Sequence, residues 1–221
     1  LFPYTTLFRS NMEPQKAATE AVRETEGQIL CQDGEAVEAY YFSTSAGVTS
    51  TDEIWGSDEA APYLRSVPCK FDEEEPWSSW IVELPWKMLE DRIREKGEGT
   101  VLRSVTVTRR SESGAATALE AVSDKDSCII ENEYEIRKFL APVNCMITEK
   151  DGTETAGGSL LPSAYFELER TQNGNLQVRG KGYGHGVGMS QTGADKMAEQ
   201  GYDYREILDY FFRNITVENL G

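Results

Sequence analysis

Residues 180–194 read GKGYGHGVGMSQTGA, and they contain the only histidine of the 221 residues, His185, with a glycine on each side. Glycine stands at every second position from Gly180 to Gly188. This spacing removes side chains along a whole segment rather than at one tight turn, so another group can approach the backbone closely. The imidazole of His185 suits proton transfer near neutral pH. The segment therefore predicts either a functional site centred on His185 or a tightly packed crossing in which His185 is a hydrogen-bonded core residue.

The glycine pattern does not match the common phosphate-binding motifs. No Gly-Lys-Ser/Thr ends the segment, as a P-loop would require, and no acidic residue follows at the distance of a dinucleotide-binding fingerprint. Ser190 lies in GMSQTG, which is one residue too long for the Gly-x-Ser-x-Gly turn of a serine hydrolase. Ser190 is instead a good N-cap for the helix expected over 194–200. A serine hydrolase that uses Ser190 with His185 as its base stays an alternative.

The composition favours a globular domain with a strongly acidic surface. The net charge of −16 argues against a nucleic-acid groove and against adhesion to anionic lipid, and we interpret it as a solubility feature. The length suits one domain, or one domain with an inserted subdomain, and no stretch is apolar enough to span a membrane. The four cysteines are widely spaced without a C-x-x-C pair, so the sequence leaves open two disulfides or single buried thiols.

The remaining patterns predict an α+β fold that is dominated by strands, with helices packed on one side. Asp33-Gly34 and Asn173-Gly174 each separate two alternating runs, which is typical of a β-hairpin. The first hairpin's second strand is expected over 35–45. Residues 76–145 are expected to form an inserted smaller α/β subdomain, and Asp203 with Glu206 predicts a capping box for a further helix. The other expected elements are helices after Pro85 and over 131–140, and strands over 101–108, 115–122, 127–130 and 215–218.

Three short segments offer candidate contacts for a ligand. Residues 43–49 are small and rich in hydroxyl groups, which suits either the lining of a groove or an ordinary turn. Trp55 and Tyr63 are aromatic anchors in a loop-like region, and they suit either stacking on a sugar or pinning the loop to the core. The acidic run from Asp72 to Glu75 is interpreted as a solvated loop.

The first ten residues, LFPYTTLFRS, resemble the translation of a sequencing-library adapter. We interpret residues 1–10 as a non-native cloning or assembly scar and exclude them from the fold. The protein itself is then expected to begin at Asn11 without its own N-terminal part.

Residues 182–212, GYGHGVGMSQTGADKMAEQGYDYREILDYFF, resemble the C-terminal signature of the stage II sporulation protein D and amidase-enhancer family. Segments 25–56 and 62–67 agree with the family in the right order, and 105–119 with 134–140 agree more weakly. The resemblance implies that residues 11–220 form a sporulation-protein-D-like domain that lacks its N-terminal part, with the insertion at about 76–145.

The resemblance further implies an extracytoplasmic protein of the cell envelope that acts on peptidoglycan glycan strands. Sporulation members are lytic transglycosylases: a carboxyl group protonates the glycosidic oxygen between the two amino sugars and then helps the C6 hydroxyl attack, leaving a 1,6-anhydro end. The alternative is a module that binds peptidoglycan without cleaving it and stimulates an N-acetylmuramoyl-L-alanine amidase. The implied partners are peptidoglycan and either a cell-wall amidase or engulfment proteins of sporulation, with no nucleic acid and with a membrane anchor in the missing segment.

The chain departs from the family pattern at the residues that would carry the chemistry. The family's glutamate stands in a Glu-Met-Pro-like motif, whereas Glu13-Pro14 lacks the methionine and the helix that should follow. The early Cys/His cluster of some members is absent, so no cofactor or metal is expected in this fragment, although zinc is possible in some full-length relatives. Phe42 stands where many members have a histidine. Truncation is the simplest explanation for the missing glutamate and metal ligands, and the fragment is expected to be inactive.

The site hypothesis places residues 43–45 opposite residues 183–191. Most of these belong to the glycine-rich segment 180–190, which we call the glycine ribbon. His185 has a supporting role, in which it bonds a sugar or orients the missing glutamate, while Gly184 and Gly186 leave room for the glycan. The expected substrate-binding residues are Ser43, Thr44, Ser45, Gly47, Tyr183, Gly184, Gly186, Ser190 and Gln191.

Overall fold

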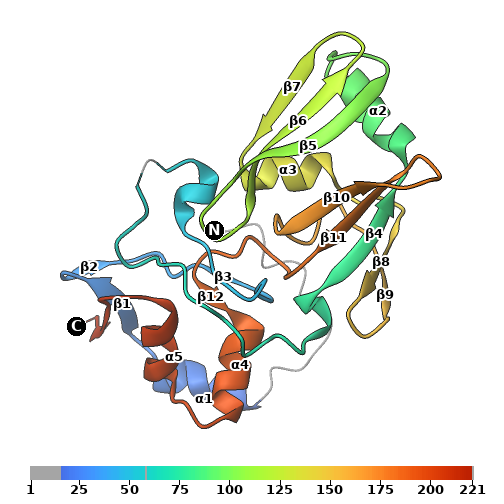
Figure 1. Cartoon of the computed structure of the whole chain (residues 1–221). Helices are drawn as coiled ribbons and strands as arrows, with labels where there is room; N and C mark the ends of the chain where they lie inside the picture. Colours follow the sequence, from blue (N-terminus) through green and yellow to red (C-terminus); the bar gives the residue numbers. More distant parts are fainter. Residues whose placement is uncertain (1–15, 58, 221) are drawn as a thin grey trace. The chain divides into compact units, whose positions relative to one another are not determined.

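A computed structural model of the chain describes residues 16–57 and 59–220, so the adapter-like segment 1–10 and Glu13-Pro14 lie outside the described residues. The chain divides into two compact units, one made of the chain up to Val37 with the end from Thr216, and the other of Glu38–Ile215. Figure 1 shows the chain coloured along the sequence, from blue at the N-terminus to red at the C-terminus.

The smaller unit holds helix α1 (Lys16–Glu24) and an antiparallel sheet in the order β13-β1-β2. Its strands are β1 (Gln28–Gln32), β2 (Glu35–Ala36) and β13 (Thr216–Asn219). Asp33 and Gly34 have φ angles of 53° and 82°, and two positive φ angles are what a type I′ hairpin turn requires. The predicted hairpin is confirmed, but its second strand ends at Ala36 because the chain beyond Glu38 pairs elsewhere.

The larger unit contains a five-stranded antiparallel sheet in the order β10-β11-β4-β8-β9. The hairpin predicted at Asn173-Gly174 joins β10 and β11 and is confirmed. Strand β4, which the sequence analysis did not predict, is central and alternates between buried and exposed side chains, as a sheet with one covered face does. The bounds are β4 (Trp80–Leu84), β8 (Met146–Glu149), β9 (Glu154–Ala156), β10 (Phe166–Arg170) and β11 (Leu176–Gly180).

A second sheet of the larger unit has the order β5-β6-β7 and lies beside two helices. Its strands are β5 (Leu102–Arg110), β6 (Ala116–Ser123) and β7 (Ser127–Glu131), and the helices are α2 (Trp86–Glu95) and α3 (Glu133–Phe139). The predicted strands and helices of this region are therefore confirmed. One hydrophobic cluster joins this sheet and its helices to β4 and β11, so the core runs past residue 145 to Val178. The predicted insertion at about 76–145 stays a prediction.

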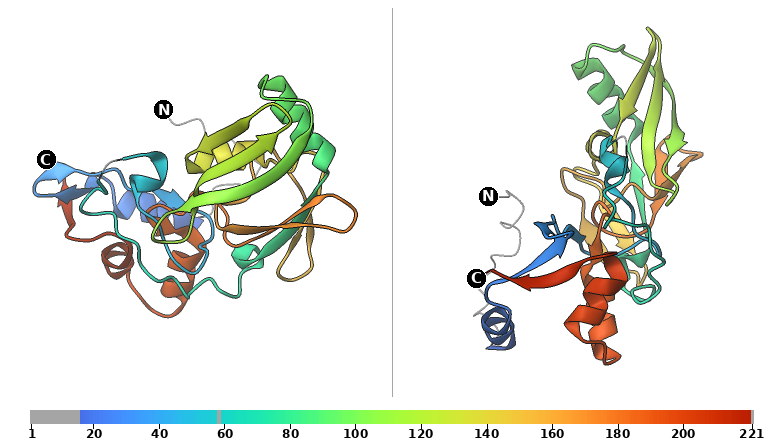
Figure 2. Two further views of the ribbon diagram at one scale, coloured as in Figure 1. Left: turned by 45° about the horizontal axis from the view of Figure 1, so that its top comes forward. Right: turned by 90° about the vertical axis from the view of Figure 1, so that its left-hand side faces the viewer.

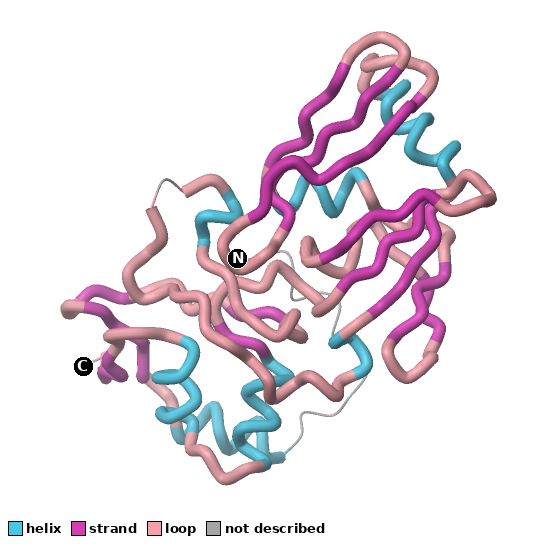
Figure 3. Tube along the Cα trace, in the orientation of Figure 1, coloured by secondary structure: helices cyan, strands magenta, loops and turns pink. Residues whose placement is uncertain are grey.

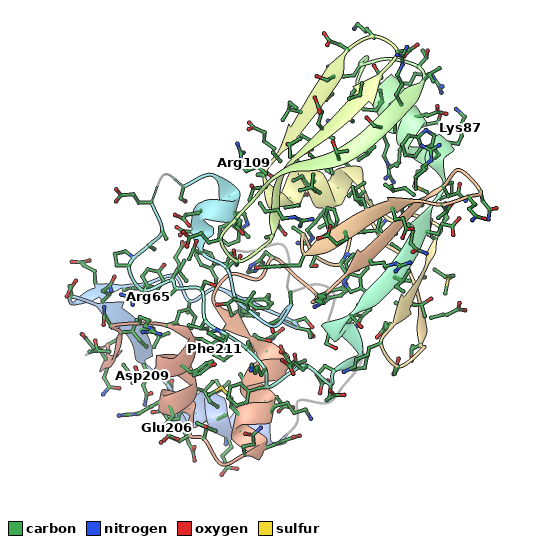
Figure 4. The ribbon with its side chains drawn as sticks, in the orientation of Figure 1. Arg65, Lys87, Arg109, Glu206, Asp209 and Phe211 are labelled. Atoms are coloured by element: carbon green, nitrogen blue, oxygen red, sulfur yellow. The ribbon has the colours of Figure 1, made fainter. Side chains whose placement is uncertain are left out.

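The other end of the larger unit carries two more helices and a short parallel strand pair (Figures 1 and 2). Strands β3 (Tyr41–Phe42) and β12 (Met189–Ser190) pair in parallel, and α4 (Gln191–Glu199) and α5 (Tyr204–Phe211) follow β12. Both side chains of the predicted capping box at Asp203 and Glu206 make their bonds. Phe211 of α5 is buried whereas Glu206 and Asp209 are exposed (Figure 4). Strands and loops outweigh helices in this fold (Figure 3), which confirms the α+β class.

Candidate functional site

The glycine ribbon lies against the segment that follows the first hairpin. Strand β12 pairs with β3, and a further bridge joins Tyr183 to Thr44 through two backbone hydrogen bonds of 2.8 and 3.0 Å. Nearer its middle, the ribbon's Gly186 carbonyl accepts from the Ser50 amide at 2.6 Å. The predicted juxtaposition of residues 43–45 with the ribbon is therefore confirmed at the level of the backbone.

The space beside the glycines of the ribbon is occupied by other atoms of the same chain. A Cβ added at Gly184 would lie 2.7 Å from the Phe42 Cβ, and one at Gly186 would lie 2.9 Å from the Tyr165 ring. At Gly188 the added Cβ would lie 2.2 Å from the Tyr40 carbonyl oxygen. Protein side chains therefore fill the space in the Cβ direction of Gly184 and Gly186, and the role of these glycines in leaving room for a glycan stays a prediction.

The ring of His185 is packed and hydrogen-bonded. The Val187 amide donates to its Nδ1 at 3.0 Å, which leaves the remaining ring proton on Nε2. The ring lies 5.2 Å from that of Trp55 and 5.8 Å from that of Phe42, both edge-on. Trp55 therefore anchors this region, as one of the two interpretations of its loop expected.

Burial and the nearby charge of Arg137 lower the pKa of His185 to about 4, with a partial offset from the Tyr41 backbone, which accepts a hydrogen bond from the ring. As a result, the imidazole is neutral at pH 7. It takes part in hydrogen bonds but carries no positive charge. The supporting role of His185 in catalysis stays a prediction.

The structure places a buried carboxylate beneath the ribbon that the sequence analysis assigned to a solvated loop. Asp72 is 1% exposed. Its Oδ2 accepts from the Ser45 amide at 2.8 Å and from the Ser190 hydroxyl at 2.6 Å, while its Oδ1 accepts from the Ser45 hydroxyl at 2.7 Å. Asp72 thus ties the end of the β3 segment to the start of α4.

The thiol of Cys69 lies beside this carboxylate, with its Sγ 3.6 Å from the Asp72 Oδ1. Burial and the charge of Asp72 raise the pKa of Cys69 to about 12, so the sulfur is a protonated and unreactive thiol at neutral pH. All four cysteines are free. Of the two outcomes that the sequence left open, the structure therefore has single thiols.

The residues expected to bind substrate separate into a buried group and a surface group. Thr44, Ser45 and Ser190 are almost fully buried, so none of the three presents its hydroxyl to solvent. Their role as glycan contacts stays a prediction that this burial does not support. Gly186 is buried as well, whereas Ser43, Gly47 and Gly184 are half-buried and Tyr183 and Gln191 are exposed.

Ser190 acts as the N-cap of α4, as expected, because its hydroxyl accepts from the Gly193 amide at 3.2 Å. The same hydroxyl donates to Asp72, and His185 uses its Nδ1 to accept from Val187. The pairing of Ser190 with His185 that a serine hydrolase would need is therefore not seen in the described part of the chain.

Two negative findings apply to residues 16–57 and 59–220. No three histidine, cysteine, aspartate or glutamate side chains gather there as a metal site would require. Within the same residues, each helix is too short or too polar to cross a bilayer.

Comparison with known proteins agrees with the resemblance in the sequence. The family model described as "Domain of unknown function (DUF8618)" matches residues 69–188. Stage II sporulation protein D of Bacillus amyloliquefaciens is 31% identical over 202 residues, which cover 91% of this chain and 51% of that protein. The Bacillus subtilis (strain 168) protein of the same name is 29% identical over 203 residues, with the same two shares.

The amidase enhancer of Bacillus subtilis (strain 168) is 22% identical over 230 residues, which cover 89% of this chain and 32% of that protein. The chain spans about half the length of the two sporulation proteins it matches. The chain belongs to the family described as "Domain of unknown function (DUF8618)", and it is a homologue of stage II sporulation protein D and of the amidase enhancer.

Proposed function

We propose that this chain is the peptidoglycan-engaging part of an envelope protein that acts in sporulation. The observation that carries the proposal is the match to stage II sporulation protein D, which extends over 91% of the chain. The rigid pairing of the glycine ribbon with the β3 segment supports it, because a pre-organised backbone loses little entropy when it holds a ligand. The location that follows is extracytoplasmic, with a membrane anchor supplied by another part of the whole protein.

The whole protein is proposed to be a lytic transglycosylase whose general acid comes from outside the described residues. Asp72 and Glu133 are two buried carboxylates of the described chain, and both are engaged. Asp72 accepts four hydrogen bonds at 2.6 to 3.3 Å, and Glu133 is buried in an ion pair with Arg137. A general acid must reach the glycosidic oxygen of its substrate, whereas Asp72 and Glu133 are each only 1% exposed.

The second candidate is a non-catalytic enhancer of a cell-wall amidase. The similarity to the amidase enhancer favours it, together with the engaged state of Asp72 and Glu133. In this version the chain holds the glycan while a partner amidase cuts the amide bond between the muramic acid and L-alanine.

Purified peptidoglycan sacculi separate these versions. We expect the 221-residue chain to sediment with sacculi, and we expect the whole protein to release muropeptides with 1,6-anhydro ends, detected by mass spectrometry. Stimulation of a purified amidase without anhydro products from the whole protein would favour the enhancer. Failure of both the chain and the whole protein to sediment with sacculi would overturn the proposed function.

A further inference from the structure

Tyr183 stands between Gly182 and Gly184 in the glycine ribbon. A Cβ at Gly182 would lie 2.8 Å from the Thr44 carbonyl oxygen, and Gly184 is equally crowded by Phe42. The backbone is therefore pressed against the β3 segment on both sides of Tyr183, while the Tyr183 side chain is 42% exposed. Close packing of the flanking glycines thus coincides with an exposed aromatic ring.

The backbone that carries this ring is fixed by hydrogen bonds that do not depend on its side chain. Besides the two bonds between Tyr183 and Thr44, the Gly182 amide donates to the Trp77 carbonyl at 2.9 Å, and the Gly184 amide donates to the Pro162 carbonyl at 2.8 Å. The Trp80 indole also donates to the Gly182 carbonyl at 2.9 Å. The backbone from which the Tyr183 ring projects is consequently fixed before any ligand arrives.

Trp77 extends the aromatic surface. It lies in the short 3-10 turn at Pro76–Ser78, is half-buried, and meets Tyr183 edge-on with ring centroids 4.6 Å apart. Tyr41 of β3, the strand that pairs with β12 of the ribbon, is exposed as well. The Tyr183–Trp77 pair suits a ligand contact, because a rigid aromatic ring presents a large contact area at a low cost in side-chain entropy.

We propose that Tyr183 and Trp77 form an aromatic platform that stacks on the apolar face of an N-acetylhexosamine ring of the glycan strand. This inference rests on the proposed function and specifies which part of peptidoglycan is recognised. The net charge of −16 favours the glycan over the stem peptides, because the carboxylates of the peptides are repelled by an acidic surface whereas a sugar face is uncharged. In this proposal the chain recognises the sugars of peptidoglycan and not its stem peptides.

The test measures the affinity of the 221-residue chain for uncharged β-1,4-linked N-acetylglucosamine oligomers by calorimetry. Tyr183→Ala should weaken binding by about tenfold, the loss of roughly one good aromatic contact, and Trp77→Ala should weaken it less. Tyr183→Phe should bind within about twofold of the wild type, because the ring is kept. Tyr202→Ala is the matched control, since Tyr202 is also 42% exposed but packs on Phe71 at the α4–α5 turn. Its affinity should not change.

Each outcome bears on one of the two proposals. If the wild-type chain sediments with sacculi and Tyr183→Ala binds the oligomers as well as the wild type does, the platform is overturned and the proposed function stands. Binding of sacculi and soluble stem peptides without binding of the oligomers also overturns the platform. If the wild type binds neither sacculi nor oligomers, the proposed function fails and the platform fails with it.

Discussion

Asp72 shows how one buried charge can hold two segments in register. A carboxylate taken out of water needs hydrogen bonds to offset the lost hydration, and Asp72 receives them from Ser45, Ser190 and Thr192. The Ser45 amide and the Ser190 hydroxyl belong to segments more than a hundred residues apart, so the carboxylate closes a long loop. Its removal would leave buried donors without an acceptor.

We expect Asp72→Ala to lower the free energy of unfolding by about 3 kcal/mol, because several buried donors lose their partner. Asp72→Asn should lose less. Its amide oxygen can replace Oδ2, its NH₂ can donate to the Ser45 Oγ, and that hydroxyl can turn to the Cys69 carbonyl, 3.2 Å away. Urea unfolding measures both variants, with the exposed neighbour Glu73→Ala as the control. Equal stability of the Asp72→Ala and Glu73→Ala variants would contradict this role.

His185 should make the fold sensitive to acid. Its pKa is about 4 in the folded chain and about 6.5 in the unfolded chain, so between these values only the unfolded chain binds the proton. The contribution of the neutral ring is fully present above pH 6.5 and is lost as pH falls toward 4, with a loss of about 2 kcal/mol by pH 4.5. Unfolding of the wild type and of His185→Gln at pH 7 and pH 4.5 isolates this effect. An equal loss in both proteins would assign the acid sensitivity to carboxylates instead.

At the scale of elements, the parallel pair β3–β12 depends on glycine for a steric reason. Gly188 has a φ of +79°, and the site of its missing Cβ is occupied by the Tyr40 carbonyl oxygen. The next residue, Met189, pairs with Tyr41. The contact between position 188 and Tyr40 therefore lies at the start of the β3–β12 pair. Any side chain at position 188 must push the two segments apart.

Gly188→Ala should therefore cost more than the strain of a left-handed backbone alone. Gly152 is a matched control in the same unit, with a φ of +86° and no atom within 4 Å of an added Cβ. We expect Gly152→Ala to cost about 1 kcal/mol and Gly188→Ala at least about 3 kcal/mol, because only the second also displaces backbone. Thermal and urea unfolding would give the difference. A cost at Gly188 no larger than at Gly152 would mean that the β3 segment moves away freely.

The local elements were predictable because their signals lie within a few residues. Asp33-Gly34, Asn173-Gly174 and the Asp203–Glu206 box each specify a turn or cap by short-range chemistry, and all three are present. Strand β4, WIVEL, was missed because it is short and lies directly before Pro85, whose signal is for the start of the helix that follows. The environment of Asp72 was also out of reach, since a carboxylate in an acidic run reveals nothing of donors that arrive from residues 45 and 190.

The glycine ribbon was predicted in part. Its glycine spacing correctly indicated a close approach of something to the backbone, but the sequence could not say that the approaching group was the chain's own β3 segment. The close packing matches the tightly packed crossing that was one of the two predictions, and the same spacing leaves Tyr183 with an exposed ring.

At the scale of the whole molecule, the charge of −16 makes a prediction about salt. Peptidoglycan carries carboxylates, so an acidic chain that binds it through uncharged sugar contacts must do so against a like-charge repulsion. Raising the salt concentration shortens the screening length from roughly 14 Å at 50 mM to about 6 Å at 300 mM and weakens that repulsion. We therefore expect the fraction of the chain that sediments with sacculi to rise between 50 and 300 mM NaCl. Binding through exposed cations such as Arg179 and Lys181 would instead weaken over the same range, and a clear fall in the sedimented fraction would transfer the interface from the aromatic platform to those side chains.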